Sequence, residues 1–104
     1  MPKAYFVVRA TVKDEAIRRK FDHWYSSDHM PWALKEFKAE KAWRFWSDSD
    51  PAIHQATYQF ADTAARDAAL KSDGLKALTA DFDKAFPTVT RTRELLTLAE
   101  ERSA

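Results

Sequence analysis

Six segments of the chain differ in the period of their apolar residues, and their order constrains the fold more than any other feature. Four segments place apolar side chains at every second position, which is typical of β-strands: 4–12, 41–46, 53–60 and 89–98. Between them, residues 14–37 and 63–86 carry apolar side chains at the spacing of amphipathic helices. This order predicts a ferredoxin-like α+β fold (βαββαβ), a four-stranded antiparallel sheet with both helices on one face.

The ends and breaks of the two helices are indicated by individual residues. Asp14 is placed to cap the first helix, and the polar run 26–28 before Pro31 predicts that this helix is broken near His29. One apolar stripe of this helix is expected to lie on the sheet: Ile17, Phe21, Trp24 and Tyr25. In the second helix, Thr63 is the expected N-cap, and the only glycine, Gly74, predicts a kink or restart.

The composition is that of one globular domain spanning residues 1–104, with a polar tail at about 100–104. Hydrophobic residues make up 45% of the chain, charged residues 32%, and the net charge of +1 gives no basis for binding nucleic acid or an anionic membrane. The absence of cysteine excludes disulfides and cysteine-bound metal. No segment has the features of a signal peptide or of a membrane-spanning helix, so we expect a cytoplasmic protein.

A sheet with both helices on one face leaves its other face bare. The side chains of Tyr5, Val7, Trp46 and Tyr58 cannot all lie on the helix side. A second copy of the same chain is the simplest cover for such a face, so we expect a homodimer formed through the open face of the sheet.

Residues 21–32 contain two histidines, two tryptophans, one tyrosine and two aspartates, a density of functional groups found nowhere else in the chain. An aromatic first helix followed by a His-x-Pro turn, here His29-Met30-Pro31, resembles the dimeric α/β-barrel superfamily, especially its EthD-like branch. Arg44 in the second strand and Phe86-Pro87 after the second helix fit the same pattern.

The resemblance implies dimers whose sheets pack face to face into a barrel, with a pocket between each sheet and its first helix. Activities in the superfamily include cofactor-free monooxygenation of aromatic polyketides, lactone isomerisation, aldoxime dehydration with haem, and haem degradation. The chain is smaller than the haem peroxidases of the superfamily, which argues against haem. We expect no cofactor, and haem binding through a histidine is the last-ranked alternative. The three histidines show no metal-binding spacing, and we expect no metal.

His29 is the main candidate for proton transfer, because the neighbouring Asp28 could fix its tautomer and raise its basicity. The alternative is that His29 caps the broken helix or bonds to a turn carbonyl. Tyr25 lies four residues earlier, on the same side of the helix as His29. It is a candidate for positioning the substrate, with a place in the core as the alternative. His54 and Tyr58 share a strand face, which lines the pocket with His29 in one register and meets the core or the partner subunit in the other.

Large side chains and arginines complete the expected site. Trp24, Trp32 and Trp46 are candidates for its apolar walls, with core packing as the alternative. Arg91, and Arg93 on the same face, could hold an acidic substrate, although an ion pair between subunits is the favoured alternative.

Two functions follow from these residues. The first is a cofactor-independent monooxygenase or isomerase acting on a flat aromatic or lactone-like molecule. The second is a non-catalytic homodimer that binds a small ligand or serves as a scaffold. Access of His29 to a cavity, as opposed to saturation by backbone partners, distinguishes them.

Overall fold

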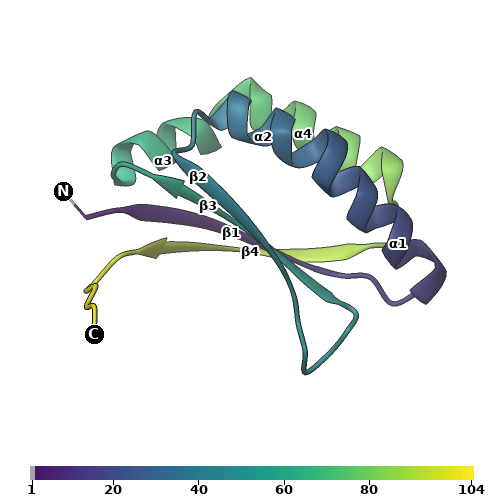
Figure 1. The fold of residues 1–104 in the computed structure, drawn as a ribbon. Coiled ribbons are helices and arrows are strands. Elements are labelled where there is room, and N and C mark those ends of the chain that lie inside the picture. The colour runs from purple at the N-terminus through teal and green to yellow at the C-terminus, as the bar shows by residue number, and fades with distance from the viewer. Residues whose placement is uncertain (1) are drawn as a thin grey trace.

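A computed structural model describes residues 2–104, and its four strands form one antiparallel sheet (Figure 1). The strands lie in the order β2-β3-β1-β4. Their bounds are Ala4–Thr11 for β1, Lys41–Trp46 for β2, Ile53–Phe60 for β3 and Thr90–Thr97 for β4. The alternation of apolar and polar residues predicted each strand to within one residue at either end.

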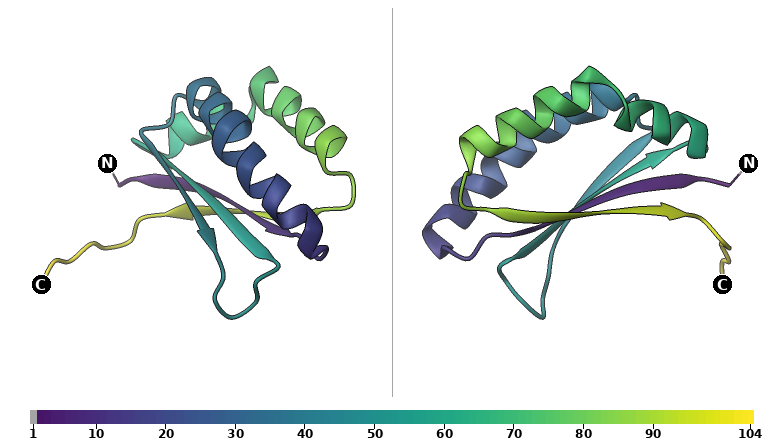
Figure 2. Two further views of the ribbon diagram at one scale, coloured as in Figure 1. Left: turned by 45° about the vertical axis from the view of Figure 1, so that its right-hand side comes forward. Right: turned by 180° about the vertical axis from the view of Figure 1, so that it is seen from behind.

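All helices lie on the same face of the sheet (Figure 2). They are α1 (Glu15–Trp24), the π-helical turn η1 (Tyr25–His29), α2 (Met30–Phe37), α3 (Thr63–Leu70) and α4 (Asp73–Ala85). The predicted ferredoxin-like α+β fold is therefore confirmed. None of the helices within residues 2–104 combines the length and the apolar character needed to cross a bilayer.

The prediction that the first helix is broken near His29 is wrong. The backbone stays right-handed helical through Trp24, Tyr25, His29 and Met30, so α1, η1 and α2 form one continuous curved helix (Figure 1). Pro31 has no N–H to donate to the preceding turn and its ring would crowd the carbonyl of residue 27. The wider π turn relieves that crowding without ending the helix.

The helix caps differ from the prediction at one position. Asp14 caps α1 as expected, accepting a hydrogen bond from the Ala16 N–H at 2.9 Å. The cap of α3 is Asp62, whose Oδ1 accepts from the Ala65 N–H at 2.8 Å, and Thr63 is the first helical residue. The predicted restart is present, because Ser72 caps α4.

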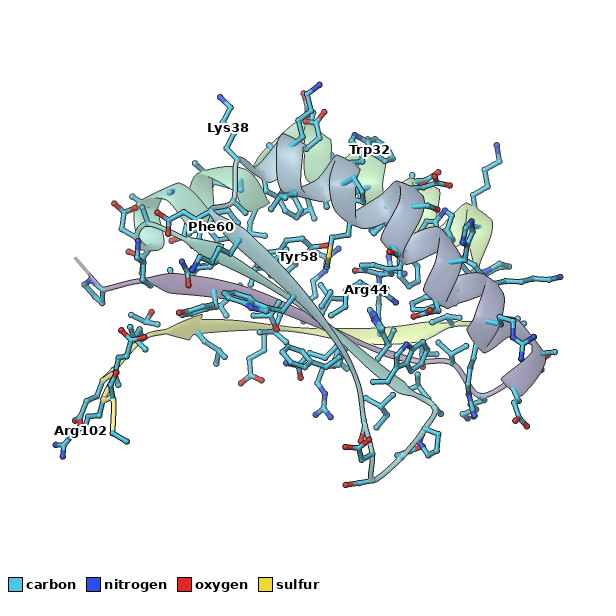
Figure 3. The ribbon with its side chains drawn as sticks, in the orientation of Figure 1. Trp32, Lys38, Arg44, Tyr58, Phe60 and Arg102 are labelled. Atoms are coloured by element: carbon cyan, nitrogen blue, oxygen red, sulfur yellow. The ribbon has the colours of Figure 1, made fainter. Side chains whose placement is uncertain are left out.

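The space between the sheet and the helices is filled largely by aromatic rings. The largest fully buried side chains include Tyr25, Tyr58, Phe21, Phe60 and His54. Figure 3 shows Tyr58 and Arg44 between the sheet and the helices, whereas Trp32 lies on the outer side of α2. The face of β3 that carries His54 and Tyr58 therefore points to the helices.

The other face of the sheet carries exposed apolar side chains. Phe45 is 52% exposed, Leu96 43% and Trp43 37%, and no helix within residues 2–104 lies on this face (Figure 2). Tyr5 and Val7 project to this side, because they alternate with Ala4 and Phe6, which point to the helices. Trp46 and Tyr58 lie on the helix side, so the four residues are divided between the faces, as expected.

Candidate functional site

A cavity with an empty volume of about 360 Å³, counted to its mouth, lies between the sheet and the helices. Side chains from β1, η1, α2, β3, α4 and β4 line it: Phe6, Val8, Tyr25, His29, Ala33, Phe37, Tyr58, Leu75, Leu78, Thr79, Phe82, Arg91 and Arg93. Leu75, Thr79 and Arg93 also border a shallow outer groove between α4 and β4, so the mouth lies on that side. This figure includes open space at the mouth. The space open to the centre of a water-sized molecule is only about 30 Å³, so the enclosed part is small and a bound ring would have to extend through the mouth.

The π turn places both Tyr25 and His29 in the cavity wall. Five buried side chains follow at intervals of four along the continuous helix: Phe21, Tyr25, His29, Ala33 and Phe37. In a regular α-helix, each step of four overshoots a full turn by about 40°, so this stripe would drift by about 160° around the helix. The π turn needs more residues to complete a turn and cancels part of that drift. One face of the helix can thus present Tyr25 and His29 together.

His29 is buried, with 6% of its surface exposed, and its Nδ1 has no hydrogen-bond partner within residues 2–104. The ring stacks on Trp24 with 4.5 Å between centroids. The carboxylate nearest its Nδ1 is Asp81 of α4, at 3.9 Å, and not the predicted Asp28, whose side chain is exposed. Burial lowers the pKa of His29 from 6.5 to about 4, with Asp81 opposing this and Arg91 adding to it. The expectation of raised basicity is therefore wrong, and the imidazole is neutral at pH 7.

Two phenol groups face the same space. Tyr25 and Tyr58 both line the cavity, and burial raises the pKa of each hydroxyl. Both remain neutral phenols at physiological pH and can donate or accept hydrogen bonds.

Two arginines of β4 stand at the cavity. Arg91 Nη1 forms an ion pair with Asp83 Oδ1 at 2.8 Å, and its guanidinium lies 4.0 Å from the ring centroid of Phe82. Arg93 Nη2 donates to Thr79 Oγ1 at 2.9 Å. The ion pair of Arg91 is thus formed within the chain, with α4, whereas the favoured expectation was a pair between subunits.

His54 belongs to a second polar cluster, behind Tyr25 and outside the cavity lining. Arg44 Nε donates to His54 Nε2 at 3.1 Å, and Arg44 Nη2 lies 2.5 Å from Asp22 Oδ1. Trp46 Nε1 donates to the same carboxylate oxygen at 2.8 Å. The hydrogen bonds from Trp46 and Arg44 lower the pKa of Asp22, whereas burial, followed by the charge of Arg44, lowers the pKa of His54 to about 4.

The structure therefore separates the predicted site residues into two groups. Tyr25, His29, Tyr58 and Arg91 line the cavity, whereas His54, Trp24, Trp32 and Trp46 do not. Trp24 packs behind His29, Trp46 belongs to the cluster with Asp22, and Trp32 is 36% exposed on α2.

Sequence reasoning missed the aromatic and polar residues that α4, β1 and α2 bring to the cavity, chiefly Phe82, Thr79, Phe6 and Phe37. It also missed the place of Asp81 beside His29. The helical spacing of Leu75, Leu78 and Phe82 was visible, but it indicates core packing and cavity lining equally well. No group of three histidine or acidic side chains within residues 2–104 is placed to hold a metal ion.

No family model matches the chain, and no curated protein matches it in sequence. Solved structures do match. SnoaB, a cofactor-independent oxygenase from Streptomyces nogalater, superimposes in a mutant form with a TM-score of 0.73 and 15% identity, over 95% of each chain. An ethyl tert-butyl ether D (EthD) family protein from Bacillus halodurans C-125 superimposes with a TM-score of 0.64 and 17% sequence identity. The match covers 90% of this chain and 97% of that one.

A dimeric ferredoxin-like protein from an uncultured marine organism gives a TM-score of 0.62 and 16% identity, over 98% of this chain and all of that chain. At these identities the likeness concerns the fold. The predicted resemblance to the dimeric α/β-barrel superfamily and its EthD-like branch is thereby confirmed at that level.

Proposed function

We propose that this protein binds a flat, oxygen-bearing aromatic or lactone-like molecule in the cavity and removes a proton from it at His29. The observation that carries the proposal is the state of His29, a buried, neutral imidazole in the cavity wall whose Nδ1 has no partner within residues 2–104. A histidine with a purely structural role would be saturated by hydrogen bonds, since an unpaired buried polar atom costs stability.

The neighbours of His29 fit proton transfer. Asp81, 3.9 Å from Nδ1, favours a proton on that nitrogen and leaves Nε2 as the acceptor for a ligand. A hydrogen bond between catalytic groups, such as the one expected between His29 and Asp81, is often long in the absence of substrate and shortens when substrate binds. A base with a pKa of about 4 accepts a proton only if the substrate anion is stabilised. Arg91, whose guanidinium lines the cavity, can supply that stabilisation through charge-assisted hydrogen bonds.

Oxygenation is the reaction we favour, because SnoaB, which shares the fold, is a cofactor-independent oxygenase. Removal of a proton from a ring CH₂ group gives a carbanion that reduces O₂ and binds it as a peroxide on that carbon. Loss of water then leaves a carbonyl, so that CH₂ and O₂ give C=O and H₂O, and the substrate supplies all electrons. An isomerase would use the same first step and return the proton to another carbon without consuming O₂.

A non-catalytic role in binding is the second candidate. It is favoured by the low pKa of His29, about 4, which makes the imidazole a weak base. In that case His29 would form hydrogen bonds with a bound ligand but would not remove a proton from it.

We further propose that the protein is a homodimer formed through the open face of the sheet. Trp43, Phe45 and Leu96 expose apolar surface there. One neighbour of the same fold is described as a dimeric ferredoxin-like protein. Packing two such faces together would remove this surface from water.

The test begins with a thermal-shift screen of the wild-type protein against naphthols, anthrone, quinones and lactones. A ligand that binds only the folded state raises the melting temperature. Each ligand found is then incubated in air with wild-type protein, His29→Gln and the control His23→Gln, whose histidine is exposed on α1. We expect O₂ uptake with an equimolar carbonyl product, lost in His29→Gln alone. Uptake that survives His29→Gln would contradict the role of His29, and binding without any turnover would favour the non-catalytic protein.

A further inference from the structure

The guanidinium of Arg93 at the cavity mouth has no carboxylate partner among residues 2–104, unlike that of Arg91. The hydrogen bond that this guanidinium makes within the described residues joins Nη2 to Thr79 Oγ1 at 2.9 Å. Its Cζ lies 5.9 Å from the ring centroid of Phe6, an aromatic residue of the cavity wall. A guanidinium carries five N–H donors in a planar fork, so most of its donors have no protein acceptor.

Arg91 is bound differently. It pairs with Asp83, lies over the ring of Phe82, and its side chain is only 15% exposed. Its charge is therefore partly compensated, and its position is held by α4. Arg93 is exposed, so it can meet a ligand at little cost in lost protein contacts.

The charges around the mouth favour an anion. Three cationic side chains, Arg91, Arg93 and Lys76, border the mouth and its outer groove, and Asp83 faces them there. With Asp81, the carboxylate beside His29, this leaves an excess of one positive charge. An anion at the mouth would be drawn by that field and bound by a fork that matches a carboxylate.

The interior of the cavity favours a flat ring. Phe6 and Tyr58 stack with 25° between their planes, and Phe37 meets the edge of each. Phe82 and Leu78 continue the apolar wall on the α4 side. A ligand that matches both regions has an aromatic ring system carrying a carboxylate at one end.

We propose that the cavity binds an aromatic carboxylate, with its ring among Phe6, Phe37 and Phe82 and its carboxylate on Arg93. This inference rests on the proposed function in that both use the same cavity, and it adds the class of ligand. A phenol or enol on the ring is then the group offered to His29.

The test compares two probes of the same shape by isothermal titration calorimetry, 6-hydroxy-2-naphthoate and its uncharged analogue 6-hydroxy-2-naphthamide. We expect wild-type protein to bind the carboxylate at least about tenfold more tightly than the amide. Arg93→Met should remove this preference, and Arg93→Lys should keep part of it, since lysine retains the charge but not the fork. Raising the salt concentration should weaken only the carboxylate complex.

Arg102→Met is the matched control, because it removes the same charge from the exposed tail. Equal binding of both probes by wild-type protein would overturn the assignment of a carboxylate ligand and leave the cavity as the proposed site. An equal loss in Arg102→Met and Arg93→Met would overturn the role of Arg93. Failure of both probes to bind would contradict the cavity itself, and with it the proposed function.

Discussion

His29 and His54 are both buried beside Tyr25, yet they differ in their partners. His54 Nε2 accepts a hydrogen bond from Arg44, whereas His29 Nδ1 has none within residues 2–104. The hydrogen bond from Arg44 fixes the orientation and tautomer of the His54 ring, whereas no hydrogen bond within residues 2–104 does so for the His29 ring, which lines the cavity. This difference is why we assign the ligand contact to His29.

Both histidines should make the stability of the protein depend on pH. Burial lowers each pKa from 6.5 to about 4, so the unfolded chain binds more protons than the folded one between these values. We predict that the free energy of unfolding is highest above pH 6.5 and falls as the pH decreases towards 4. Each histidine would contribute on the order of 3 kcal/mol to the full decrease.

Urea denaturation at a series of pH values from 7.5 to about 5 measures this dependence, before most carboxylates titrate. His29→Gln and His54→Gln should each flatten the slope, and His23→Gln, an exposed substitution on α1, is the control. A wild-type slope of zero across this range would show that neither imidazole is buried in its neutral form.

At the scale of elements, the strands could be predicted closely because the period of two leaves little freedom in a sheet covered on one face. β2 and β3 begin and end where the alternation predicts. The continuity of the helix around His29 could not be predicted. The polar run and the proline there resemble the end of a helix: Ser26, Ser27, Asp28 and Pro31. The interval of four between buried residues was the available evidence for a continuous, wider turn.

The N-cap of α3 allows a matched test. Asp62→Ala should lower the free energy of unfolding by about 1 kcal/mol, because the Ala65 N–H loses its acceptor. Thr63→Ala, at the neighbouring first helical position, should have a smaller effect. Urea denaturation of both variants measures the difference, and a larger loss for Thr63→Ala would contradict the assignment of the cap.

Shortening the π turn tests its role in placing His29. Deletion of Ser27, combined with Pro31→Ala to remove the clash in a regular helix, puts Ala33 and Phe37 at regular helical spacing after Tyr25. We expect this variant to unfold cooperatively with a loss of less than about 2 kcal/mol, but to bind ligand more weakly, because His29 then follows Tyr25 by three residues and its ring is displaced along and around the helix relative to the Tyr25 ring.

Pro31→Ala alone and Ser27→Ala are the controls, since both keep the number of residues in the turn. Calorimetric titration measures the affinity of each variant for the probe that binds wild-type protein most tightly. Unchanged affinity in the shortened variant would show that the π turn does not position the ligand contact.

For the whole molecule, the order of strands and helices predicted the layers, because few arrangements cover a sheet with two helices. The composition of the cavity was less predictable. Tyr25, His29 and Tyr58 could be proposed from their strand and helix faces, but the three tryptophans suggested walls that the structure assigns to packing or to the surface. Which large side chain reaches a cavity depends on tertiary packing, which no local period encodes.

Two neighbouring leucines of β4 test the proposed dimer. Leu96 is 43% exposed on the open face of the sheet, and Leu95 is 50% exposed on the helix side. Leu96→Glu should shift the protein from dimer to monomer and remove the dependence of its melting temperature on concentration, because it buries a charge in the interface. Leu95→Glu should leave the dimer intact.

Sedimentation equilibrium of the two variants and the wild type gives the oligomeric state directly. A monomeric wild type, or equal dissociation in both variants, would contradict an interface on the open face.

The most direct test of the ligand site is a nitrogen NMR titration of protein labelled with ¹⁵N only in its three histidines. The signals are assigned with His29→Gln, His54→Gln and His23→Gln, and 2-naphthol is then added. We predict that the ring-nitrogen signals of His29 shift to saturation on binding, while those of His23 and His54 move little. Binding of 2-naphthol with no change at His29, or with equal shifts at all three histidines, would contradict the assignment of His29 to the ligand site.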